Sequence, residues 1–310
     1  MKSVRAFAPG TVANLGPGFD VLGLAVTGVG DAVIAERGSD GEIRIRSSGH
    51  PEIPSEAERN SAGIAAARVR ERAGKADVGF TLRVEKGLPL SGGQGGSAAS
   101  AVAAAVAVNE LLGSPFGKDE LLPPCLEAET AVAGRHADNV AAALFGGVVL
   151  VRSLEPLDVV RLPFPRDLRI VLVQPRQRLR TEDARARLPR TVDLGIAVAQ
   201  AAGVGALVAA LAARDYDLLR RSVDDRIAEP ARAPLLPGFA EAKSAALSAG
   251  ALGCSISGSG PSSFAFATDE DSARRIGEAM VAAYRARGIE ASARTGAIDG
   301  KGARIDGVEE

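Results

Sequence analysis

The sequence predicts an α+β protein built from two domains. Segments with strand-like and helix-like patterns are mixed along the chain without a strict alternation of strand and helix. The length of 310 residues also exceeds what one small core needs. A connection marked by prolines over residues 154–165 favours a boundary there. We therefore expect an N-terminal domain at residues 1–158 and a C-terminal domain at residues 159–310.

In the first half, short alternating or apolar runs predict strands, and runs rich in alanine predict helices. Strands are expected at residues 4–7, 32–36, 43–46, 80–84 and 146–152, and helices at residues 61–73, 97–112 and 121–133. We expect Pro9 and Gly10 to end the first strand, because both residue types interrupt regular structure.

In the second half, the same patterns predict a further set of strands and helices. Strands are expected at residues 168–174, 254–256, 263–267, 291–294 and 303–305, and helices at residues 181–188, 193–211, 215–222, 239–249 and 271–287. The apolar stretch 196–213 is mostly alanine and contains Gln200, Gly203 and Gly205. Because alanine favours membrane insertion only weakly, this stretch predicts a buried helix pair and not a membrane span.

The composition argues against several classes of function. A net charge of -1 does not suit a general nucleic-acid binder, and nine Phe, two Tyr and no Trp supply few stacking platforms for single strands. Two cysteines cannot form a disulfide framework, and with two histidines they leave no structural zinc site. The first residues show no long apolar core of a signal peptide. We therefore expect a cytoplasmic protein without a nucleic-acid or membrane partner.

The glycine-rich segment 89–100 lies between a predicted strand and a predicted helix. Its small residues let backbone amides approach an anion, and the helix start adds unpaired N–H groups and a positive dipole end. The segment therefore predicts a phosphate cradle, with a flexible turn as the alternative. It lacks the Gly-x4-Gly-Lys-Ser/Thr pattern of P-loop proteins. A dinucleotide fold is disfavoured because no second strand ending in an acidic residue follows.

Several segments, in order, resemble the homoserine kinases. They are residues 8–23, 89–100, 134–139 with 145–147, 181–185, 227–232 and 253–264. The glycine-rich segments alone indicate only the wider superfamily of galactokinase, homoserine, mevalonate and phosphomevalonate kinases. The resemblance implies an N-terminal domain like the second domain of ribosomal protein S5 and a ferredoxin-like C-terminal domain. It also implies transfer of the γ-phosphate of ATP to the side-chain hydroxyl of L-homoserine, with Mg2+, in threonine biosynthesis, and a homodimer.

The resemblance also implies roles for individual residues. A carboxylate is best held by the planar donors of arginine, and Arg185 and Arg232 occupy the matching positions. Asp20 is expected to accept from the substrate ammonium, and Asn14 and His136 to contact the hydroxyl end. Asp138 is the candidate general base, or it braces Asn139. The substrate-binding candidates are Asn14, Asp20, His136, Arg185 and Arg232, and the catalytic candidates are His136, Asp138 and Asn139.

For Mg2+, the resemblance implies Glu129 with Ser97, and Glu127 as a fallback. Asn60 is expected near the adenine, and the glycine loop around the phosphates. The nucleotide-binding candidates are Asn60, Pro89, Leu90, Ser91, Gly92, Gly93, Gln94, Gly95, Gly96, Ser97, Ala98 and Ala99.

The loop departs from the family pattern in three ways, the first of which is the transposition of one serine at residues 91–92. Gln94 replaces a leucine, and Gly96 replaces the first serine of a pair. The backbone cradle should survive, because glycine preserves it, but the help of one side chain is lost. Two alternatives therefore stay open: a sister kinase acting on mevalonate-type or sugar substrates, and an ATP-binding protein with impaired catalysis.

Overall fold

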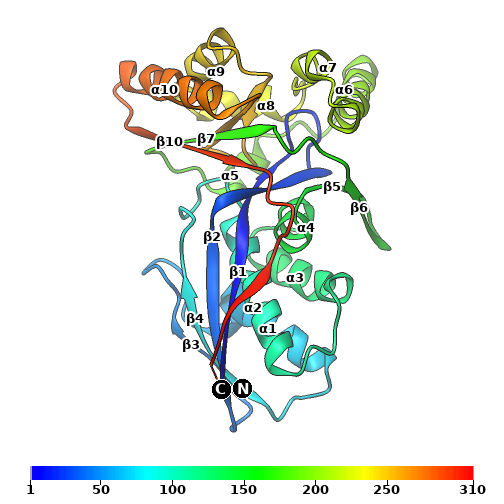
Figure 1. Cartoon of the computed structure of the whole chain (residues 1–310), viewed down its shortest axis with the longest axis vertical. Coiled ribbons are helices and arrows are strands. Elements are labelled where there is room, and N and C mark those ends of the chain that lie inside the picture. The colour runs from blue at the N-terminus through cyan, green and yellow to red at the C-terminus, as the bar shows by residue number, and fades with distance from the viewer. Residues whose placement is uncertain (1, 310) are drawn as a thin grey trace.

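The computed structural model describes residues 2–309, which form two β-sheets with helices packed against them (Figure 1). The larger sheet has the order β11-β1-β2-β4-β3, with β5 beside β2 and β6 beside β5. Its strands are β1 (Ser3–Ala13), β2 (Leu22–Gly38), β3 (Ile43–Ser47), β4 (Gly79–Glu85), β5 (Val148–Leu154), β6 (Leu157–Leu162) and β11 (Arg304–Glu309). The smaller sheet contains β7 (Arg169–Pro175), β8 (Cys254–Ile256), β9 (Ser263–Ala267) and β10 (Ala291–Ala297).

Four helices cover the larger sheet, with α2 at the centre. They are α1 (Ser61–Arg72), α2 (Gly96–Leu111), α3 (Lys118–Val132) and α4 (Asp138–Phe145), preceded by a 3-10 turn at Ala57–Arg59. Helix α2 packs against β1, β2, α1 and α3. Most of its buried residues are alanine, and side chains this small allow close packing on all sides. This close packing holds the start of α2 firmly beneath the glycine loop.

The smaller sheet has the strand order β10-β7-β9-β8. In chain order this is 4-1-3-2, with all neighbours antiparallel, which is the ferredoxin-like arrangement. The helices of this half are α5 (Thr181–Ala186), α6 (Leu194–Ala213), α7 (Tyr216–Arg220), α8 (Ala228–Arg232), α9 (Phe239–Ser248) and α10 (Glu270–Ala286), with a 3-10 turn at Ala233–Leu235. The α+β class and the two-domain architecture are thus confirmed.

The first two strands differ from their predicted limits. Strand β1 does not end at Pro9 and Gly10 but runs on to Ala13. The pairing of β1 with β2 shifts register between Pro9 and Gly10, and such a bulge accommodates a proline inside a ladder. Strand β2 begins at Leu22, within a segment for which no strand was predicted. The two long strands carry the first motif, residues 8–23, from the sheet to the centre of the molecule.

The predicted buried helix pair at residues 196–213 is wrong. The stretch is one helix, α6, and only Gln200, Leu207, Ala210 and Leu211 are buried on it. Glycine costs a helix only about 1 kcal/mol relative to alanine, so Gly203 and Gly205 do not break it. By length and composition alone α6 could cross a membrane. Its inner face nevertheless packs on the first motif, since a side chain at residue 203 would lie 3.1 Å from Pro17.

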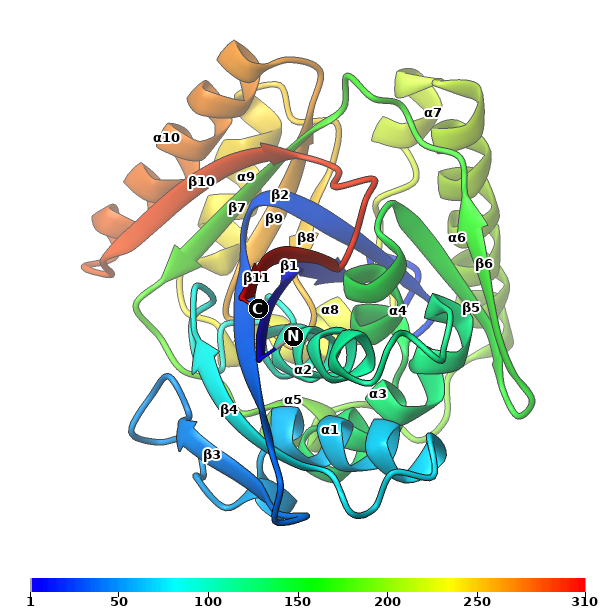
Figure 2. The ribbon, with the colours of Figure 1, turned by 60° about the horizontal axis from the view of Figure 1, so that its bottom comes forward.

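The two sheets do not divide the chain at a single point. Strand β11, at the end of the chain, pairs with β1, so both termini lie at one edge of the larger sheet (Figure 2). The predicted boundary at residues 158 and 159 falls inside β6, a strand that was not predicted and that forms a hairpin with β5. The connection between the two sheets therefore follows Leu162, and the boundary at 158 and 159 stays a prediction.

Candidate active site

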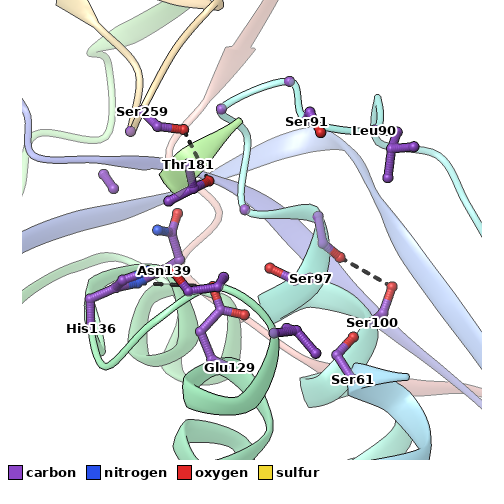
Figure 3. A pocket seen from close by; sticks show the side chains of 18 of the residues that line it. Ser61, Leu90, Ser91, Ser97, Ser100, Glu129, His136, Asn139, Thr181 and Ser259 are labelled. Carbon is purple, nitrogen blue, oxygen red and sulfur yellow. Dashed lines mark hydrogen bonds and ion pairs between the residues drawn. The ribbon is translucent and has the colours of Figure 1, made fainter. Parts of the chain in front are cut away.

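A pocket opens between the two halves of the molecule and is lined by both of them (Figure 3). The glycine loop and the start of α2 form one wall. The connection between α3 and α4 contributes Glu129, His136, Asp138 and Asn139. The first motif and the C-terminal half complete it with Asn14, Asp20, Thr181, Arg185, Arg232, Gly258 and Ser259. The segments that were singled out from the sequence therefore meet in one place.

The glycine loop contains backbone conformations that residues other than glycine rarely adopt. Gly93 and Gly95 have φ values of 72° and 69°, in the left-handed region that favours glycine. A Cβ on Gly95 would lie 2.0 Å from Thr11 Oγ1, and a Cβ on Gly93 would lie 2.4 Å from the Ser257 carbonyl oxygen. The loop leads directly into α2, whose first N–H groups have no partner within the helix. This arrangement can hold a phosphate group.

Most of the predicted nucleotide residues line the pocket. They are Asn60, Pro89, Leu90, Ser91, Gly92, Gly93, Gly95, Gly96 and Ser97. Asn60 is buried, and its side chain caps α1 by accepting from Ala62 N at 2.9 Å. Gln94, Ala98 and Ala99 do not line the pocket. Once the helix begins at Gly96, Ala98 and Ala99 turn into the core, and the Gln94 side chain points toward the C-terminal half.

Three ionisable side chains are buried together below the loop. His136 Nδ1 lies 3.6 Å from Asp138 Oδ1 and 3.9 Å from Glu129 Oε1. Burial alone would lower the pKa of His136, but the two neighbouring carboxylates outweigh it and raise this pKa to about 9. Burial raises the pKa of Glu129. Glu129 Oε2 and His136 Nδ1 are buried without a hydrogen-bond partner, so the cluster has capacity left for a ligand.

Asp138 and Asn139 stand where α4 begins. Asp138 Oδ1 accepts from the backbone N–H of Asn139 at 2.8 Å and from Asn139 Nδ2 at 3.3 Å. Thr11 Oγ1 donates to Asn139 Oδ1 at 2.6 Å. Asp138 thus does brace Asn139, and its carboxylate also lines the pocket. Figure 3 shows Asn139 and Ser97 directed into the same cavity as Glu129.

The other end of the pocket carries an ion pair and a second arginine. Arg185 donates to both carboxylate oxygens of Asp20, at 2.7 and 3.0 Å. Arg232 Nη1 donates to the Gly258 carbonyl at 2.9 Å, and burial together with the charge of Arg185 lowers the pKa of Arg232. Asn14 donates to the same Gly258 carbonyl at 3.0 Å. The Nε atoms of both arginines are buried without a partner, so both guanidinium groups retain an unused donor.

Two residues in or beside the pocket were missed from the sequence. The ring of Phe19 lies beneath both guanidinium groups, 5.6 Å from that of Arg185 and 5.0 Å from that of Arg232. Lys86 lines the pocket, pairs with the buried Asp31, and donates to the Gly96 carbonyl at 3.0 Å. Its position between a predicted strand and the glycine loop is the signal that could have identified it.

Comparisons with known proteins agree with this geometry. Residues 60–147 match the family model for the GHMP kinases N terminal domain, and residues 207–286 match that for the GHMP kinases C terminal. A homoserine kinase of Chlorobium phaeovibrioides is 46% identical over 98% of this chain and 100% of its own length. One of Arabidopsis thaliana is 45% identical over 98% of this chain and 84% of its own length.

Solved structures give the same result. A crystal structure of homoserine kinase from Cytophaga hutchinsonii is 44% identical, covers 99% of this chain and 98% of its own, and superposes with a TM-score of 0.95. Galactokinase of Lactococcus lactis, 18% identical with a TM-score of 0.72 over 97% of this chain and 95% of its own, shares the fold. The chain therefore belongs to the homoserine kinase family, within the GHMP kinases.

Proposed function

We propose that the protein transfers the γ-phosphate of ATP to the side-chain hydroxyl of L-homoserine, giving O-phospho-L-homoserine and ADP for threonine biosynthesis. The observation that carries the proposal is the pairing of two unlike sites in one pocket. An anion cradle of backbone amides lies at one end, and Asp20 with Arg185 and Arg232 lies at the other. The relatives, which are homoserine kinases at about 45% identity, support this assignment.

The charged end suits an α-amino acid head group. In the structure Asp20 and Arg185 form an ion pair, so each charge is neutralised by the other. A substrate that carries both an ammonium and a carboxylate offers the same two charges, so the ammonium binds Asp20 and the carboxylate binds the arginines. Mevalonate and galactose have no ammonium group, and they would leave Asp20 without a charged partner. This difference favours homoserine over the substrates of the sister kinases.

The side-chain hydroxyl of homoserine then lies toward His136, Asp138 and Asn139. Phosphoryl transfer depends mainly on positioning and on neutralising charge. Asp138 is oriented by Asn139 and is the proposed acceptor of the hydroxyl proton. With a pKa of about 9, His136 is a cation at neutral pH, and its positive charge stabilises the ionised form of the neighbouring carboxylates in this buried site.

The residues present fit a magnesium ion bound with the nucleotide. Glu129 supplies a buried carboxylate oxygen without a partner, and Ser97 lies opposite it (Figure 3). Mg2+ in kinases is held by one or two carboxylates and by the phosphates of the substrate, so a cluster of three protein ligands is not required. When bound, the ion would neutralise phosphate charge. We assign Glu129 and Ser97 as its protein ligands.

A substrate panel tests the proposal. ADP release from ATP is measured after addition of L-homoserine, mevalonate or galactose, with a circular-dichroism check of folding. Strong stimulation by L-homoserine alone is expected. A folded protein without any stimulation would contradict the proposal, as would a preference for one of the other two substrates. Binding of ATP in calorimetry without turnover would instead identify an ATP-binding protein with impaired catalysis.

We also propose that the protein acts in the cytoplasm as a homodimer. The family resemblance supports both statements. Light scattering combined with size-exclusion chromatography measures the mass in solution, and a mass near 31.6 kDa would mean a monomer.

A further inference from the structure

Gln94 lies in the middle of the glycine loop but faces away from the pocket. Only 3% of the residue is exposed. Its Nε2 donates to Gln174 Oε1 on β7 at 3.0 Å and to Ser262 Oγ at 2.9 Å. Ser262 Oγ in turn donates to Gln174 Oε1 at 2.6 Å. The three side chains form a closed ring of hydrogen bonds, which we call the glutamine clasp.

The clasp joins the loop of one half of the molecule to the sheet of the other half. Two further contacts run across the same boundary and reach the residues just before Gln94. Ser257 Oγ donates to the Gly93 carbonyl at 2.6 Å, and Ser262 N donates to the Gly92 carbonyl at 3.3 Å. Among the hydrogen bonds of the described residues, Gln94 provides the only side chain of segment 89–97 that bonds to the C-terminal half.

A loop of this kind needs such an attachment. Ser91, Gly93 and Gly95 all have positive φ, and residues 89–95 belong to no helix or strand. Glycine has the largest conformational freedom to lose, so an unattached loop would sample many arrangements. The backbone amides can form a phosphate cradle only in one of these arrangements. Thr11 N donates to the Gln94 carbonyl at 3.1 Å, and a side-chain contact that also holds Gln94 increases the fraction of molecules that are ready to bind.

We infer that Gln94 is a positioning residue for ATP, which acts through the clasp and without touching the nucleotide. A leucine, as the family pattern has at this position, could make none of these hydrogen bonds. The departure at Gln94 thus gives the loop a polar attachment to the other half of the molecule. The inference rests on the proposed function to the extent that the cradle binds ATP.

Binding of MgATP without homoserine tests the inference directly. Calorimetry compares the original protein with Gln94→Leu, Gln174→Leu and the double variant. Each single change removes buried hydrogen bonds and is expected to raise the Kd for ATP about tenfold. The Kd of the double variant should be about equal to that of the more affected single variant, because both changes break the same ring. Independent effects would instead multiply and raise the Kd about a hundredfold.

Two additional measurements separate positioning from general damage. Hydrogen exchange of the amides in residues 90–97 should become faster in Gln94→Leu, while the amides of β1 and β2 stay protected. In turnover assays the KM for homoserine should stay within about twofold while the KM for ATP rises. The matched control is Gln177→Leu, which removes a glutamine that donates to the Pro237 carbonyl at the surface of the same half; its Kd for ATP should be unchanged.

The inference is overturned if folded Gln94→Leu keeps both its ATP affinity and its loop protection, or if the effects of the two glutamines multiply. Should Gln94→Leu fail to fold, Ser262→Ala breaks the same ring with a smaller change and is expected to weaken ATP binding about threefold. Unchanged ATP affinity in Ser262→Ala would then refute the clasp. The binding assay contains no homoserine, so it tests the role of Gln94 even if the proposed kinase activity is not observed.

Discussion

The two ends of the pocket are built from different parts of the chain. At the phosphate end, the wall consists largely of backbone, with glycines whose missing side chains leave room for close contacts. At the substrate end, the wall consists of charged side chains: Asp20 pairs with Arg185, and Arg185 and Arg232 both lie over the Phe19 ring. One end is therefore suited to an anion, through amides and a helix start, and the other end is suited to a zwitterion, through charged side chains.

This difference determines which changes each end tolerates. A side-chain substitution at the phosphate end should preserve activity as long as the backbone conformation is unchanged. An added Cβ that collides with backbone atoms should abolish it. The chain itself fits this expectation, because Gln94 and Gly96 depart from the family pattern while the loop still leads into the start of α2 and lines the pocket. At the substrate end, replacing one side chain should strongly reduce binding, because individual charged side chains make the contacts there.

The largest effect is expected for Gly93→Ala. The new Cβ would lie 2.4 Å from the Ser257 carbonyl oxygen and 2.8 Å from that of Gly260, at a φ of 72°. Backbone on both sides cannot move away, so the loop must leave its cradle conformation. We expect kcat/KM for ATP to fall by about three orders of magnitude, roughly 4 kcal/mol.

The control for Gly93→Ala is Gly113→Ala. Gly113 has a φ of 85°, but a Cβ there would meet nothing within 4 Å. It therefore carries the conformational strain without the collision, and it should retain kinase activity with a small loss of stability. Equal activity in the two variants, measured on folded protein, would show that the phosphate end does not depend on this close approach.

The next effect is that of Arg185→Ala at the substrate end. Loss of a bidentate charged contact should cost about 2–4 kcal/mol in kcat/KM for homoserine, while ATP binding is spared. Arg187→Ala, an exposed arginine just beyond the same short helix, serves as the control. Steady-state kinetics with each substrate varied in turn measures both values. Unchanged homoserine kinetics would remove Arg185 from the site.

The comparison also shows how far the sequence alone could lead. Motif resemblance predicted Asp20, Arg185 and Arg232 for one site, and these residues, far apart in the chain, do line one pocket. The sequence predicted a helix from residue 97, one residue after its observed start at Gly96, but it could not show that Ala98 and Ala99 in the first turn face the core. The direction of a side chain beside a helix end depends on the angle at which the chain enters, which local patterns do not record.

The same limit explains the differences in the fold. Pro9 and Gly10 normally end a strand, but a bulge against β2 lets β1 continue, and that partner lies about twenty residues away. The Lys86 side chain was missed because its role depends on the buried Asp31, a contact across the sheet. Long-range pairing of this kind is set by the whole core and not by the neighbouring residues.

A moderate effect is expected for Phe19→Leu. The ring lies 5.0 and 5.6 Å from the two guanidinium groups, and at about 0.5 kcal/mol for each cation–π contact the two together contribute about 1 kcal/mol. Leucine keeps the apolar bulk but has no π face. We expect the KM for homoserine to rise about fivefold with the KM for ATP unchanged. A rise confined to ATP would contradict the assignment of this end to the amino acid.

The smallest effect is expected for Gly96→Ser, which restores the serine of the family pattern. A Cβ at this position would lie 3.2 Å from Lys86 Nζ, which pairs with Asp31 and would have to shift by a few tenths of an ångström, and no closer than 3.7 Å to any backbone atom among its nearest neighbours. The loop can therefore accept the serine, and kcat/KM for ATP should stay within about threefold. A gain above tenfold would mean that the backbone cradle alone is insufficient. A loss as large as that of Gly93→Ala would mean that the phosphate end rejects side chains as well as backbone collisions, and the contrast between the two ends would fail.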